Sequence, residues 1–104
     1  MPNDSVILSS IKKNVHRVLP DARVLLFGSR AYGTPADESD WDILILTTSP
    51  VTASIKSAIH SKLFPVSVQI GAFINTLTIQ ENEWRDNPSW YSLKQTVTKG
   101  MLQL

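Results

Sequence analysis

The sequence predicts an α/β (α+β) domain, with a small mixed sheet of about three strands flanked by helices. Short apolar runs suited to buried strands alternate with longer segments whose apolar residues recur at helical spacing. Pro and Gly residues separate these segments and mark their ends. A chain of 104 residues, 42% of them apolar, can bury one modest core. We therefore expect a single minimal domain over residues 1–104.

The first half of the chain is expected to hold a helix and two strands. Apolar residues recur at helical spacing from Ile7 to Val18, after a cap at Asp4 or Ser5, until Pro20-Asp21 ends the helix. Val24–Phe27 and Trp41–Thr47 are short apolar runs, which are typical of strands buried on both faces. The loop of about a dozen residues between them leaves their relative direction open.

A second helix and a third strand are expected next. Ser49-Pro50 has the pattern of a cap followed by Pro at the first helical position, and Ile55–Leu63 carries an apolar stripe. Pro65 is expected to restart the chain in extended form, with a third strand at Val66–Phe73. The helix between the second and third strands would make that pair parallel.

The C-terminal part is expected to be helical. Thr78–Glu81 has capping-box spacing and predicts the start of a short helix, which Asn87-Pro88 would break. A last helix, from Trp90 to Met101, would end or bend at Gly100. The aromatic residues of this region, Trp84, Trp90 and Tyr91, are interpreted as core packing in preference to an exposed patch for a partner chain.

Composition excludes several classes of protein. The net charge of +1 and the lack of a basic stripe do not favour binding to nucleic acid. The absence of cysteine excludes disulfides and cysteine-based zinc sites. The longest apolar run, Ile43–Leu46, is too short to span a membrane, and the N-terminus has no signal-peptide layout. We expect a cytoplasmic protein.

The first candidate binding segment is Gly28-Ser29-Arg30, where a strand passes into an expected helical turn. Gly28 lacks a Cβ atom, so it permits an unusual φ and lets a ligand approach the backbone closely. Free N–H groups at a helix start attract anions, and the Ser29 hydroxyl could donate to a phosphate oxygen. Arg30 could pair with phosphate or lie on the surface.

The second candidate is a pair of carboxylates, Asp40 and Asp42. Side chains two residues apart on a strand point to the same face. Adjacent carboxylates repel each other unless a cation lies between them, and Mg²⁺ prefers oxygen ligands such as carboxylates and phosphates. Because Asp42 opens the apolar run Ile43–Leu46, an unpaired carboxylate there would be costly. The sequence therefore predicts a phosphate–metal site.

The segment GSRAYGTPADESDWDILIL resembles the signature of minimal nucleotidyltransferases of the DNA polymerase beta superfamily. The leading helix, the approach to Gly28 and the C-terminal Lys99–Leu102 also resemble such domains. The resemblance implies a nucleotidyltransferase fold in which Gly28, Ser29 and Arg30 hold the phosphates of a nucleoside triphosphate, with ATP expected. It also implies that Asp40 and Asp42 are the catalytic carboxylates and ligate Mg²⁺.

The family normally supplies a third carboxylate from a neighbouring strand. With the third strand placed at Val66–Phe73, that position falls on Ser67, with Gln69 next on the same face. A neutral oxygen attracts Mg²⁺ much less than a carboxylate does. Asp37, Glu38 or a partner's carboxylate could replace it. We expect nucleotide binding to be retained and transfer to be weakened or partner-dependent.

Two functions follow from this interpretation. The first is an Mg²⁺-dependent enzyme that transfers a nucleoside monophosphate from a triphosphate to a hydroxyl. The resemblance implies a small helical protein as its partner, in a module similar to a toxin–antitoxin pair. The alternative is a weakened nucleotide-binding or protein-binding module that acts as an antitoxin-like partner of such a protein.

Overall fold

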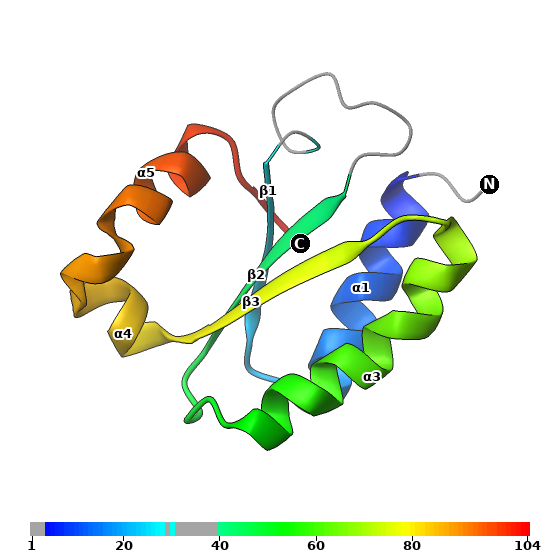
Figure 1. The fold of residues 1–104 in the computed structure, drawn as a ribbon, viewed down its shortest axis with the longest axis horizontal. Helices are drawn as coiled ribbons and strands as arrows, with labels where there is room; N and C mark the ends of the chain where they lie inside the picture. The colour runs from blue at the N-terminus through cyan, green and yellow to red at the C-terminus, as the bar shows by residue number, and fades with distance from the viewer. Residues whose placement is uncertain (1–3, 29, 31–39) are drawn as a thin grey trace.

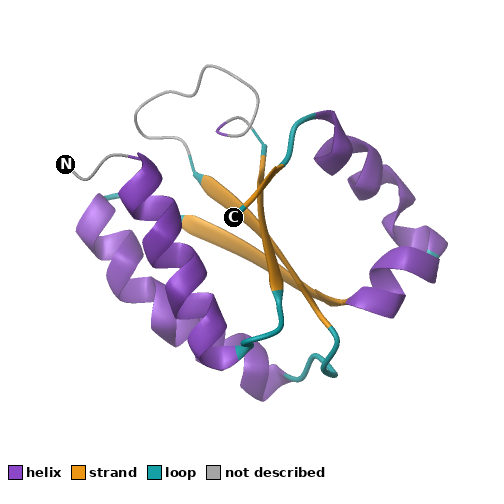
Figure 2. Ribbon diagram, turned by 180° about the vertical axis from the view of Figure 1, so that it is seen from behind, coloured by secondary structure: helices purple, strands orange, loops and turns teal. Residues whose placement is uncertain are grey.

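A mixed sheet of four strands separates two groups of helices in the computed structural model, which describes residues 4–28, 30 and 40–104 (Figures 1 and 2). One face is covered by α1 (Asp4–Val18) and α3 (Ala53–Ile70). The other face is covered by α4 (Glu81–Asp86), the 3₁₀ turn η1 (Pro88–Trp90) and α5 (Tyr91–Lys99). The strands are β1 (Arg23–Phe27), β2 (Trp41–Thr47), β3 (Ile74–Gln80) and β4 (Leu102–Gln103). The expected fold class is confirmed, with one strand more than the sequence indicated.

Side chains on both faces of strand β2 are buried in the core, as its apolar run predicts. Ile43 and Ile45 pack with α1 and α3, whereas Leu44 and Leu46 pack toward α4 and α5. All four side chains are buried. No helix within the described ranges is long and apolar enough to cross a membrane.

The sheet order is β3-β2-β1-β4. Strands β1 and β2 are antiparallel, which settles the direction that the sequence left open. Strands β2 and β3 are parallel and are connected by α3, as expected for a helical crossover. The end of β1 and the starts of β2 and β3 therefore lie at the same edge of the sheet.

The third strand expected at residues 66–73 is wrong. Helix α3 continues through Pro65 to Ile70, and the strand that follows is β3. The buried residues of α3, at Ile59, Leu63, Val66 and Ile70, are spaced by four, three and four positions. Burial of this stripe against the core outweighs the missing N–H of Pro65, which costs a helix interior about 3 kcal/mol.

The caps of α3 also differ from those expected. Thr52, and not Ser49, caps the start, because its Oγ1 accepts a hydrogen bond of 3.1 Å from the Ile55 N–H. Gly71 ends the helix at φ +69°, and its N–H donates to the Val68 carbonyl while the Ala72 N–H donates to the Ser67 carbonyl. This pair of bonds is the Schellman arrangement, for which glycine is the favoured residue.

The helix start expected at Thr78 is likewise corrected, because residues 78–80 complete β3 and α4 begins at Glu81. The last helix ends at Lys99, so Met101 lies outside it, and the segment after Gly100 forms β4 along β1. The Leu104 N–H extends this pairing with a 2.8 Å bond to the Val24 carbonyl. Trp84 and Trp90 pack against the core as expected, whereas Tyr91 is 64% exposed.

Pro65→Ala tests the path of α3. Pro65 is exposed, so its replacement removes no buried contact. The new N–H can join the helix, and we expect a gain of about 2 kcal/mol in unfolding free energy after allowance for the more flexible unfolded chain. Urea denaturation measures this change in unfolding free energy. Gln69→Ala, on the same helix, is the control and should change stability little. A loss of stability in Pro65→Ala would contradict a helix through residue 65.

Candidate functional site

Three of the predicted phosphate and metal residues, Gly28, Asp40 and Asp42, come together at the edge of the sheet where β1 ends and β2 and β3 begin. Antiparallel pairing sets Phe27, the last residue of β1, beside Asp42 of β2. Parallel pairing sets Asn75 of β3 beside Asp42 on the other side. Gly28, directly after β1, and Asp40, directly before β2, complete the cluster.

Gly28 lies against the Asp42 carboxylate. Its φ is +78°, in the region that only glycine adopts readily. A Cβ atom at this position would collide with Asp42 Oδ2, which is a contact that real Cβ atoms do not make. Residue 28 therefore has to be glycine for two independent reasons, its backbone angle and the carboxylate packed against it.

Asp40 and Asp42 converge on one side chain that the sequence analysis missed, Asn75. The Asn75 Nδ2 donates to Asp40 Oδ2 at 3.0 Å and to Asp42 Oδ1 at 3.3 Å. Asp40 and Asn75 are exposed, and Asp42 is half-buried. The alternation of apolar and polar residues in Leu77–Gln80 was a signal for this strand, but it does not set the register that brings Asn75 beside Asp42.

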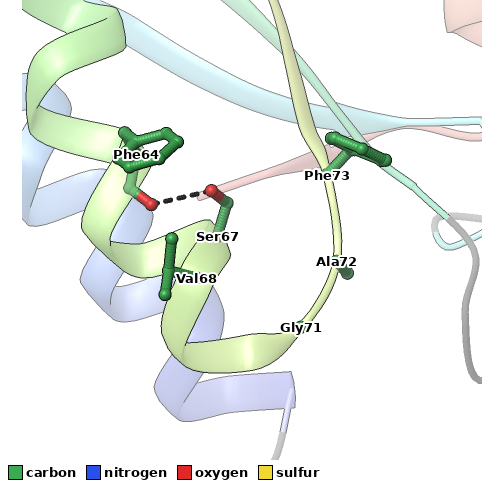
Figure 3. A pocket seen from close by; sticks show the side chains of 6 residues that line it. All are labelled: Phe64, Ser67, Val68, Gly71, Ala72 and Phe73. Atoms are coloured by element: carbon green, nitrogen blue, oxygen red, sulfur yellow. Dashed lines mark hydrogen bonds between the residues drawn. The ribbon is translucent and has the colours of Figure 1, made fainter.

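Ser67 does not belong to this cluster. It lies on α3, where its hydroxyl donates a 2.7 Å hydrogen bond to the Phe64 carbonyl, one turn back along the helix (Figure 3). It lines a pocket of about 450 Å³ formed with Phe64, Val68 and the Gly71–Phe73 turn, on which neither Asp40 nor Asp42 borders. The assignment of Ser67 to the third-carboxylate position is therefore wrong, because it required a strand where the chain forms a helix.

Arg30 stacks on Trp41 at the same edge of the sheet. Its guanidinium carbon lies 4.2 Å from the centroid of the Trp41 ring, and Trp41 is 2% exposed. Such a stack holds the cation in place over the aromatic face. The backbone of Arg30 is helical, in agreement with the expected turn. Ser29 and residues 31–39, including Asp37 and Glu38, lie outside the described residues, so their expected roles stay predictions.

The donor set of the cluster is two carboxylates and one amide. Within residues 4–28, 30 and 40–104, no group of three or more His, Asp or Glu side chains is placed to hold a metal ion. Two converging carboxylates still match the oxygen ligands that Mg²⁺ takes in phosphate sites, typically one or two acids with the remainder from substrate and water.

Comparison with known proteins decides the family. A family model described as a nucleotidyltransferase domain matches residues 8–95, which is most of the chain. The chain belongs to the nucleotidyltransferase domain family. The resemblance drawn from residues 28–46 is thereby confirmed. No curated protein matches the chain.

Solved structures with the nucleotidyltransferase fold superpose on most of the chain. Spectinomycin adenyltransferase AAD(9) from Enterococcus faecialis, solved with ATP and spectinomycin, has a TM-score of 0.69 and 22% identity over 89% of this chain. The chain spans only 45% of that protein. A mutant of the toxin–antitoxin MntA-HpeT has a TM-score of 0.61 and 19% identity, over 98% of this chain and 72% of that one. A toxin–antitoxin structure with AMP-PNP has a TM-score of 0.58 and 21% identity, over 98% of this chain and 72% of that one.

Gly28→Ala and Gly71→Ala form a matched pair of variants that tests the packing of the site. Both glycines have positive φ, but a Cβ atom at Gly71 meets nothing within 4 Å. Gly71→Ala should cost only the backbone strain, about 1 kcal/mol of unfolding free energy. Gly28→Ala should cost at least about 2 kcal/mol, because Asp42 must also move. Equal losses in urea denaturation would contradict the contact between Gly28 and Asp42.

Proposed function

We propose that this nucleotidyltransferase-family chain is an enzyme that moves a nucleoside monophosphate from a nucleoside triphosphate, with ATP as the expected donor, to a hydroxyl acceptor. The reaction depends on Mg²⁺. The hydroxyl oxygen attacks the α-phosphorus, a new P–O bond forms, and pyrophosphate leaves with the electrons of the bond that breaks. The hydroxyl proton passes to water or to a base that the acceptor's protein supplies.

One observation carries this proposal, the convergence of Asp40 and Asp42 beside the glycine at the end of β1. The two acids lie close enough together to share the amide nitrogen of Asn75, at 3.0 and 3.3 Å. Because Gly28 has no Cβ atom, the Asp42 carboxylate packs directly against the backbone there. A cation held between the two acids would therefore lie close to the Gly28 backbone, where a triphosphate could meet it.

Each residue has a separate part in the proposed site. Asp40 and Asp42 would hold Mg²⁺, which neutralises triphosphate charge and stabilises the in-line transition state when it is bound. Gly28 and Ser29 would contact the phosphates through backbone N–H groups and a hydroxyl. Arg30 would add positive charge nearby, from the position over Trp41 where its guanidinium already lies.

A protein partner is part of the proposal. Both of the toxin–antitoxin structures described above superpose on nearly the whole of this chain. Phe64, Val68 and Phe73 are 56%, 65% and 76% exposed and gather around the pocket of Figure 3, which is typical of a surface that a partner covers. We propose a small helical protein as that partner. The single-domain organisation and the cytoplasmic location stay predictions.

The alternative is a module that binds nucleotide or a protein partner and transfers poorly. Asn75 favours it, because an amide stands on β3 where the pairing with Asp42 would bring a third acid into the cluster. A neutral ligand stabilises a cation less than a carboxylate does. Transfer assays separate the two functions, since the alternative predicts binding without transfer.

Asp42→Asn tests the proposed function. Calorimetric titration of ATP with Mg²⁺ should show binding to the wild type that weakens at least about ten-fold in the variant, because a charged ligand is lost. Asp21→Asn, the same change at an exposed turn residue, should bind as the wild type does. ATP labelled at the α-phosphate, incubated with the protein and a co-purified partner, should then transfer its label.

The outcomes are distinct. Mg²⁺-dependent binding with transfer supports the enzyme, and binding without transfer supports the alternative. Binding that Asp42→Asn leaves unchanged would contradict the placement of the site at β2. No binding by the wild type would contradict the enzyme and the nucleotide-binding module, and would leave only the protein-binding form of the alternative.

A further inference from the structure

Among residues 4–28, 30 and 40–104, Asn75 hydrogen-bonds both acids from a neighbouring strand of the sheet. Asp42 has two neighbours in the sheet, Phe27 on β1 and Asn75 on β3. On the β1 side the chain continues into Gly28, which has no side chain. On the β3 side, Asn75 reaches both Asp40 and Asp42.

The amide of Asn75 occupies the place where a cation between the two acids would be. Its NH₂ group has two donor hydrogens, and one nitrogen lies within hydrogen-bond distance of an oxygen from each carboxylate. These two bonds offset part of the repulsion between the carboxylates, although they bring no full charge. Rotation of the amide by half a turn exchanges Nδ2 for Oδ1, and a side-chain amide oxygen is an accepted ligand of hard divalent cations.

We propose that Asn75 is a neutral ligand that makes this a site for one divalent cation. Without a cation, its Nδ2 holds Asp40 and Asp42 together. With a cation, its Oδ1 turns toward the metal as a neutral third ligand. The inference rests on the proposed function in one respect: both place their ligand, the cation or the triphosphate, at the same edge of the sheet.

The negative charge of the cluster formed by Asp40, Asp42 and Asn75 limits the number of divalent cations that it can bind. Two carboxylates carry two negative charges, which one divalent cation balances, whereas a neutral amide adds nothing to hold a second. An acid at residue 75 would add one negative charge to the cluster. The new carboxylate would lie within reach of both Asp40 and Asp42. It should tighten the first cation and, with a triphosphate present, make room for a second.

Manganese binding measured by calorimetry tests the inference, with and without a non-hydrolysable ATP analogue. The wild type should bind one Mn²⁺ in both conditions. Asn75→Asp should bind the first Mn²⁺ at least about ten-fold more tightly and should take a second with the analogue. Asn75→Ala should bind one Mn²⁺ several-fold more weakly, since it loses a ligand.

Asn82→Asp is the matched control. It makes the same change of amide to carboxylate on α4, beyond the far end of β3, and its carboxylate can still accept the Glu83 N–H that Asn82 accepts now. It should bind Mn²⁺ as the wild type does. Thermal unfolding of each variant without metal confirms that the variants are folded.

The results separate this inference from the proposed function. One Mn²⁺ per wild-type chain, with the expected change in Asn75→Asp, supports the inference even if the analogue does not bind, in which case the proposed function fails alone. Two Mn²⁺ in the wild type with the analogue would overturn the inference and leave the proposed function standing. Unchanged stoichiometry and affinity in Asn75→Asp, or no Mn²⁺ binding by the wild type, would also overturn it.

Discussion

The contact between the Asp42 carboxylate and the Gly28 backbone is the constraint on which the site depends. It exists because β1 and β2 pair in one register, with Phe27 beside Asp42. A shift of one residue would turn Asp42 toward the helices α1 and α3 and would move Ile43 or Trp41, both buried, into the half-buried place that Asp42 now occupies. The apolar core therefore fixes the register, and the register brings the acid to the glycine. Any residue larger than glycine at position 28 would disturb both the strand register and the contact with Asp42.

The second consequence of this register is the choice of third ligand. Since Gly28 contributes no side chain, the described part of the cluster is completed from β3, which offers the amide of Asn75. Asn75 therefore combines two properties: it holds the acids together through its hydrogen bonds, and it limits the charge available to a cation. The cluster described at this end of the sheet therefore combines two carboxylates with one neutral amide.

The sequence predicted the parts of the molecule whose signals are local. Trp41–Thr47 was placed correctly, because an apolar run of this length is buried on both faces wherever it pairs. Gly28, Asp40 and Asp42 were recognised from a motif within fifteen residues. The helix over Ile55–Leu63 was predicted correctly, but residues 66–80 were misplaced, because Pro65 ordinarily ends a helix, whereas packing of Val66 and Ile70 carries α3 past it. Asn75 lies 33 positions beyond Asp42, so only the sheet register could reveal their contact.

The most direct test of the account is to locate the bound nucleotide by paramagnetic broadening in the NMR spectrum of the protein with Mn²⁺ and a non-hydrolysable ATP analogue. The account predicts that backbone amide signals of Gly28, Asp42 and Asn75 broaden first, while those of Glu81 and Asn82, beyond the far end of β3, stay sharp. Broadening centred on Phe64, Ser67 and Phe73, or none at any of these residues, would contradict it.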